Sequence, residues 1–138
     1  MKKLLILLPL SLLVVVAFYN VENCFAANNS IKILEIDPAT STQLKSGSEI
    51  HFKVKLEYTV TDDSAVVNMT FQKGEDSGSL DSVIGNTMQV LSKGKGTIIM
   101  EKTVMIPDTN VLQVFTPLMI PGQTKTTTVD VKVYKVIK

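Results

Sequence analysis

The segment from Ile50 to Thr61 alternates apolar and polar side chains at every step, and it constrains the fold more than any other feature. A period of two places successive side chains on opposite faces of a β-strand, whereas a helix would spread the same apolar residues around its circumference. The pattern therefore predicts a strand with one buried and one solvated face. Its apolar members are Ile50, Phe52, Val54, Leu56, Tyr58 and Val60.

Shorter runs with β-type composition lie on both sides of this segment, and turn-forming residues separate them. Seven short strands at roughly even spacing predict an all-β fold, namely an antiparallel Greek-key β-sandwich. The Gly-, Ser- and acid-rich segment from Lys73 to Ser82 is expected to form the longest loop. The other six predicted strands are 31–36, 65–72, 86–91, 97–106, 111–120 and 126–137, with turns at 46–48, 61–64, 93–96, 107–108 and 121–122.

The N-terminus has the pattern of an export signal. Lys2 and Lys3 precede an apolar run from Leu4 to Tyr19, and the triplet Cys24-Phe25-Ala26 places small residues at positions −3 and −1 of a cleavage site. The run is shorter than the roughly 20 residues that span a bilayer, which favours cleavage over a retained anchor. We therefore predict a signal peptide over residues 1–26, cleaved after Ala26, and a secreted or periplasmic domain over residues 27–138 without a stable membrane anchor.

Removal of the export segment limits the chemistry that the domain can perform. Residues 27–138 contain no cysteine, no arginine and one histidine, with twelve lysines against twelve acids. A neutral domain argues against nucleic-acid binding, which usually requires a basic excess. A single histidine, His51, supports neither a zinc site nor a nucleophile paired with a base. We predict a protein without catalytic residues or cofactors.

Two alternatives remain open at this point. The acidic pairs Asp62-Asp63 and Glu75-Asp76 offer oxygen ligands for calcium, although their spacing differs from that of an EF-hand and equally suits solvated turns. A small hydrolase would need His51 as a base or two acids on either side of a cleft, and the candidate acids are expected on exposed strand faces. Those acids are Glu35, Glu57 and Glu101.

Several of these segments together resemble the immunoglobulin-like and fibronectin type III-like β-sandwiches of secreted bacterial proteins. The resemblance lies in Pro38, in Leu44-Lys45-Ser46-Gly47 before the long alternating strand, and in the terminal Val131-Lys132-Val133-Tyr134-Lys135-Val136. It implies a glycine turn that leads into a core strand, and two facing sheets. The buried tryptophan and the cysteine pair usual in such domains are missing. By fold analogy alone, the resemblance implies a role in adhesion or ligand binding.

The segment from Val111 to Ile120 is unusually apolar for a single strand. Its alternation cannot bury both sets of side chains against one sheet, so we predict that part of it forms an apolar surface for a protein or cell-surface partner. The alternative is that neighbouring segments cover both faces. The resulting hypothesis is a non-catalytic binding or structural module; the alternative is an inhibitor or accessory subunit that uses the Lys73–Ser82 loop. The predicted partner-binding residues are Val111, Gln113, Phe115 and Leu118.

Overall fold

A computed structural model describes residues 28–74 and 80–138, and most of these residues lie in β-strands. The predicted all-β class is therefore confirmed. The predicted export segment and the acidic pair Glu75-Asp76 lie outside the described residues. The elements are β1 (Ser30–Asp37), β2 (Leu44–Lys45), β3 (Glu49–Lys73), the 3-10 helix η2 (Leu80–Ser82), β4 (Val83–Met105), β5 (Val111–Met119) and β6 (Thr128–Ile137).

Strands β3 and β4 form one long antiparallel hairpin that is bent in the middle. Each of these two strands joins two of the predicted strands into one. Strand β3 continues through residues 61–64 and β4 through residues 93–96, so the turns predicted there are wrong. The pairing runs from Glu49 opposite Met105 to Gln72 opposite Val83, with a register shift between Val60 and Ser64. The bend contains residues typical of turns because a bulge can also require backbone angles that few residues adopt. Gly94 has a φ of +132°, which favours glycine.

The side chain of Asn29 bridges the bulge in β3. Its Oδ1 accepts a hydrogen bond of 2.8 Å from the backbone N–H of Thr61, and its Nδ2 donates one of 2.9 Å to Oδ2 of Asp62. The bulge removes backbone groups from the β3–β4 ladder, and an unpaired buried backbone group is costly. Asn29 therefore supplies a partner that the neighbouring strand no longer provides.

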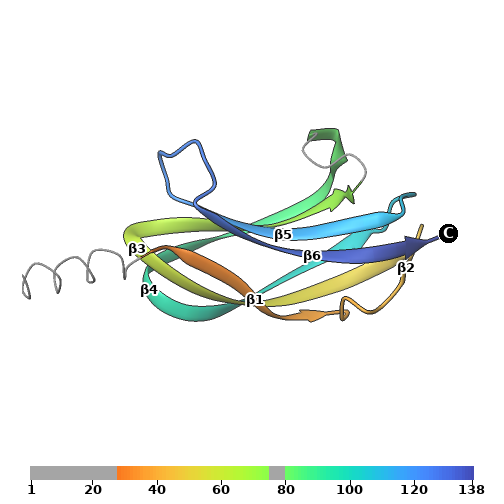
Figure 1. The fold of residues 1–138 in the computed structure, drawn as a ribbon, viewed down its shortest axis with the longest axis horizontal. Helices are drawn as coiled ribbons and strands as arrows, with labels where there is room; N and C mark the ends of the chain where they lie inside the picture. Colours follow the sequence, from red (N-terminus) through yellow and green to blue (C-terminus); the bar gives the residue numbers. More distant parts are fainter. Residues whose placement is uncertain (1–27, 75–79) are drawn as a thin grey trace, which may run out of the picture.

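The bend folds the sheet into two layers (Figure 1). One layer contains β1, the first half of β3 and the second half of β4; the other contains the remaining halves of β3 and β4, with β5 and β6. Strand β2, which was not predicted, pairs in parallel with the end of β6. The result is a six-stranded mixed sheet in the order β1-β3-β5-β6-β2, with β4 on β3. The Greek-key links stay a prediction.

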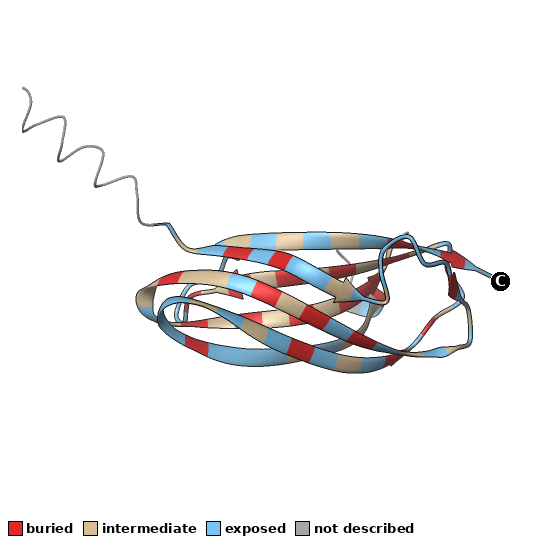
Figure 2. Cartoon of the chain, turned by 90° about the horizontal axis from the view of Figure 1, so that it is seen from below, coloured by how far each residue is buried: buried red, intermediate tan, exposed pale blue. Residues whose placement is uncertain are grey.

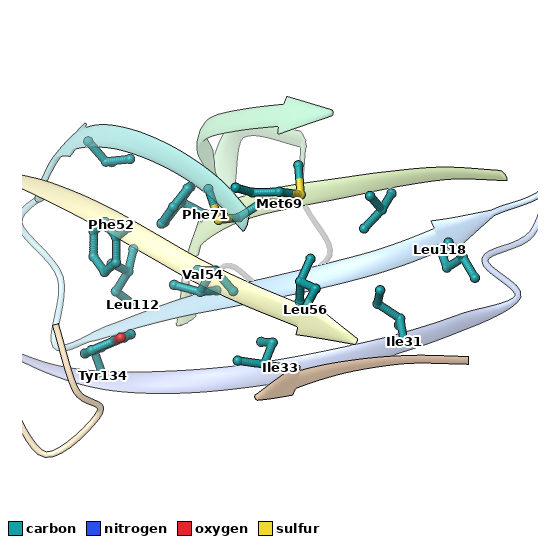
Figure 3. Close-up of a cluster of buried hydrophobic side chains, with 14 of the residues drawn as sticks. Ile31, Ile33, Phe52, Val54, Leu56, Met69, Phe71, Leu112, Leu118 and Tyr134 are labelled. Atoms are coloured by element: carbon teal, nitrogen blue, oxygen red, sulfur yellow. The ribbon is translucent and has the colours of Figure 1, made fainter. Parts of the chain in front are cut away.

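The core lies between the two layers and is aromatic at its centre. The ring of Phe52, from the first half of β3, is 4.9 Å from the ring of Phe71 in the second half and 5.6 Å from that of Tyr134 on β6. In β3, buried apolar residues occupy even positions before the bend and odd positions after it, because the bulge shifts the face of the strand. Figure 3 shows these side chains pointing into the shared interior, and Figure 2 shows the alternating burial along each strand.

Tyr134 links β6 to the connection between β1 and β2. Its hydroxyl donates a hydrogen bond to the carbonyl oxygen of Pro38, and its side chain is completely buried. Burial raises the pKa of Tyr134 well above its usual range, and the nearby negative charge of Asp37 raises it further. The folded protein therefore holds the phenol proton more tightly than the unfolded chain does.

Substitution of Tyr134 by phenylalanine is expected to change how stability depends on alkaline pH. Near pH 7, loss of the hydrogen bond to Pro38 should lower the free energy of unfolding by about 1 kcal/mol. Above about pH 10 the unfolded tyrosine ionises while the folded one does not, so the wild type loses up to about 1.4 kcal/mol per pH unit. Urea unfolding at pH 7 and at pH 9–11 should show the deficit of Tyr134→Phe shrinking as pH rises. A constant deficit would contradict the raised pKa.

Candidate functional site

The two outer surfaces of the folded sheet differ sharply in charge. On the layer that contains β1, we call the exposed surface of β3 and β4 the charged face. Lys53 lies 3.4 Å from Glu101 across the strands, and Lys55 lies 3.7 Å from Glu35 of β1. These ion pairs are exposed, and pairs of this kind contribute little to stability. The other members of the charged face include His51, Glu57, Thr97, Ile99 and Thr103.

His51 takes part in a polar network on the charged face. Its Nδ1 is 2.9 Å from Oγ1 of Thr103, which lies directly opposite on β4, and its Nε2 is 3.6 Å from Oε2 of Glu101. The order of hydroxyl, imidazole and carboxylate is the one that an activated nucleophile requires. The side chains of His51 and Glu101 are 57 % and 47 % exposed. We interpret the network as a solvated cross-strand cluster, since water competes for every hydrogen bond on such a surface.

The opposite layer has an outer surface with few charged residues; we call its part between the two rows named below the uncharged face, and Lys135, opposite Val111, lies just beyond it. The strand registers define this face, because directly opposite residues on paired strands point to the same side of the sheet. One row across the strands contains Val90, Val66 and Met119. The row at the other end contains Gln72, Gln113 and Val133. Between the rows lie mostly apolar side chains, several of them largely exposed. The other members of the uncharged face are Asn68, Thr70, Asn86, Met88, Phe115, Pro117, Val129 and Val131.

A shallow hollow of about 430 Å³ lies on the uncharged face, over β5 and β6. Its apolar walls come from Phe115, Pro117, Val129 and Val131, and further lining residues are Gln72, Gln113 and Thr126. Apolar walls with a few polar groups at the rim are typical of a site that receives a side chain or a small apolar group. Elsewhere on this face, the buried amide oxygen of Asn68 has no hydrogen-bond partner among the described residues.

The structure divides the four predicted partner-binding residues between two sides of β5. Val111, Gln113 and Phe115 are half-buried and point outward, and Phe115 lines the hollow. Leu118 points inward and is completely buried, so its assignment to a binding surface was wrong. The reason is the period of two: positions 111, 113 and 115 have one parity and position 118 has the other.

Sequence reasoning missed the valines of β6 and the exposed residues of β4. Val129, Val131 and Val133 alternate with Asp130 and Lys132, so hydrophobicity alone would place the valines in the core. They point outward because Tyr134 and Val136 are the residues of β6 that enter the core. The break in alternation at Val133-Tyr134 was the only signal of this reversal.

Among the described residues, no further acidic side chains lie beside Asp62-Asp63 to complete a calcium site. Oδ2 of Asp62 already accepts a hydrogen bond from Asn29, and Glu75-Asp76 lies outside the described residues. Over residues 28–74 and 80–138, no group of three or more His, Cys, Asp or Glu side chains is placed to hold a metal ion. The same residues contain no helix long and apolar enough to cross a membrane.

Comparisons with known proteins add little to this geometry. Neither a protein-family model nor a curated protein sequence matches the chain. One solved structure, a β-glucosidase from Listeria innocua in complex with gluconolactone, is similar with a TM-score of 0.46 and 16 % identity. The similarity covers 82 % of this chain and 16 % of the β-glucosidase chain. At this level the likeness carries no argument about activity.

Proposed function

We propose that this protein is a non-catalytic module that binds a protein partner through the uncharged face. The observation that carries the proposal is the difference between the two outer surfaces: one has exposed ion pairs, while the other has exposed valines and Met88. Contiguous apolar surface on a soluble domain commonly marks an interaction site. Secretion, for which the export pattern in residues 1–26 is the support, belongs to the same proposal.

The chemistry of the uncharged face favours a partner surface that is itself apolar and uncharged. Strand registers place no lysine, aspartate or glutamate between the two rows of this face, and the chain has no arginine; Lys135, beyond the last row, is the one lysine that borders the face on β6, so an anionic ligand would find little complementary charge there. The hollow beside Phe115 suits one apolar anchor side chain from the partner. The amide of Gln113, which is half-buried and also lines the hollow, can exchange hydrogen bonds with the partner backbone.

The immunoglobulin-like or fibronectin type III-like architecture is part of the proposal as well. Two packed layers with an aromatic core between them support it. Sheet faces in such architectures are available for contacts with other proteins, so the uncharged face needs no cleft in order to bind. The alternative of an inhibitory Lys73–Ser82 loop involves residues 75–79, which are outside the described part of the chain.

Substitution of Phe115 by glutamate is expected to abolish partner binding without unfolding the domain. A carboxylate in the apolar hollow would lose hydration on binding without gaining a counter-charge, so the dissociation constant should rise by at least about tenfold. The partner is first captured from native culture supernatant with the wild-type protein as bait. Its affinity for each variant is then measured by calorimetry with both proteins purified.

Ile99→Glu is the matched control, because Ile99 is an exposed apolar residue on the charged face. Its affinity for the purified partner should equal that of the wild type, and both variants should retain the wild-type circular dichroism spectrum. Equal binding by Phe115→Glu and the wild type would refute the proposal. So would a loss of binding in Ile99→Glu alone.

A further inference from the structure

In the described part of the chain, no strand pairs with the second edge of β4. Within residues 28–74 and 80–138, its only strand partner is β3. An open edge presents unpaired N–H and C=O groups, and it can pair with another strand. Most proteins protect such edges with charges, prolines, bulges or covering segments. Whether this edge is protected differs between the two halves of β4.

Strands β1 and β6 carry charged side chains, and other segments contact parts of their outer edges. The backbone N–H of Ile33, at the bulge in β1, donates a hydrogen bond of 2.7 Å to Oδ2 of Asp130 on β6. The end of β6 is covered by β2, with Leu44 opposite Val136. The second half of β4 carries charged side chains, namely Lys93, Lys95, Glu101 and Lys102.

The first half of β4 lacks charges and prolines, and its register shift lies at its start, around Ile84, before the stretch from Asn86 to Ser92. From Val83 to Ser92 it contains no charged residue and no proline. Met88 and Val90 in this stretch are 64 % and 67 % exposed. This unpaired edge of the first half of β4 therefore borders the uncharged face. A strand added at this edge would extend the sheet and, with it, the uncharged face.

We propose that two copies of this chain pair through the first half of β4, antiparallel across a two-fold axis at Gln89. In this register Met88 of each copy lies opposite Val90 of the other, so the two most exposed apolar residues of the edge cover each other. Asn86 lies opposite Ser92, which pairs polar with polar. The two copies of Gln89 meet at the axis, where their amides can bond to each other.

No charge opposes a second copy at this edge, and the edge sequence is complementary to itself. The proposed register brings no like charges opposite each other, because the stretch from Val83 to Ser92 is uncharged. The domain over residues 27–138 is also neutral, so two copies do not repel each other overall. Antiparallel pairing about a two-fold axis is self-complementary, so one sequence supplies both sides. The sheet would then run continuously through both copies.

A cysteine at the proposed axis gives the sharpest test. Directly opposite residues in an antiparallel pair have Cα atoms about 4.5–5.5 Å apart, within the range for a disulfide. Purified Gln89→Cys is expected to form a covalent dimer under mild oxidation; Cys24, the one cysteine of the chain, is replaced by serine in every variant so that it cannot cross-link. Thr97→Cys is the control, an exposed position in the second half of the same strand. Equal cross-linking of the two variants would overturn the proposal.

Sedimentation equilibrium tests the same interface without a covalent bond. The wild type should form dimers as its concentration rises, and Gln89→Lys, which places two like charges at the axis, should raise the dimer dissociation constant by about tenfold or more. Ile99→Lys should dimerise like the wild type. A wild type that stays monomeric up to about 1 mM, or dimers that are lost in Phe115→Glu but kept in Gln89→Lys, would overturn the edge pairing. Because Gln89→Lys leaves the hollow intact, partner capture by this variant tests the proposed function separately.

Discussion

Replacing Phe52 by alanine is expected to lower the free energy of unfolding by about 3–5 kcal/mol, the range for a buried aromatic side chain. Phe52 is completely buried and contacts an aromatic ring from each of two other segments, Phe71 and Tyr134. Its removal leaves a cavity between the two layers, which the bent hairpin cannot close without moving both halves of β3. Urea unfolding followed by far-UV circular dichroism would measure the loss.

Ile99→Ala provides the comparison for this measurement. Ile99 is 53 % exposed on the charged face, so its truncation should change the free energy of unfolding by less than about 1 kcal/mol. A domain of this size has a total stability of about 5–15 kcal/mol, so Phe52→Ala should retain a measurable folded state in the absence of urea. Similar losses in the two variants would show that the core is not centred on Phe52.

The sequence predicted the strands of this fold better than it predicted how they join. Alternation from Ile50 to Val60 marked the buried side of β3 correctly, because a period of two is a local property. The bend was not predictable from the same pattern. Thr61-Asp62-Asp63-Ser64 has the composition of a chain reversal, and what makes it a bulge is pairing with β4 and the hydrogen bond that the backbone N–H of Thr61 donates to Asn29.

The same limit explains what was missed at the candidate site. A run of alternating valines, such as Val129 to Val133, indicates which residues share a face but not which face is buried. The outcome was decided by Tyr134, whose bulky ring enters the aromatic core and fixes the parity of β6. The uncharged face is formed from four strand segments that are far apart in sequence, and only pairing brings Met88 and Val131 to the same surface.

Truncation of Leu118 and of Phe115 to alanine should separate the core side of β5 from its binding side. Leu118 is completely buried opposite Val67, which is also completely buried, so Leu118→Ala is expected to lower the free energy of unfolding by about 2–5 kcal/mol. Phe115 lies on the outer surface and is only half-buried, so its truncation should have an effect of about 1 kcal/mol. Urea unfolding of both variants gives the two values.

Binding measurements on the same two variants should show the reverse order. Phe115→Ala removes a wall of the hollow and should weaken partner binding, whereas folded Leu118→Ala keeps every outward side chain and should bind like the wild type. Two residues three positions apart on one strand would then have opposite roles, because an odd spacing places them on opposite faces. If Leu118→Ala lost binding while remaining folded, the partner would depend on the shape of the core, and the uncharged face alone could not account for recognition.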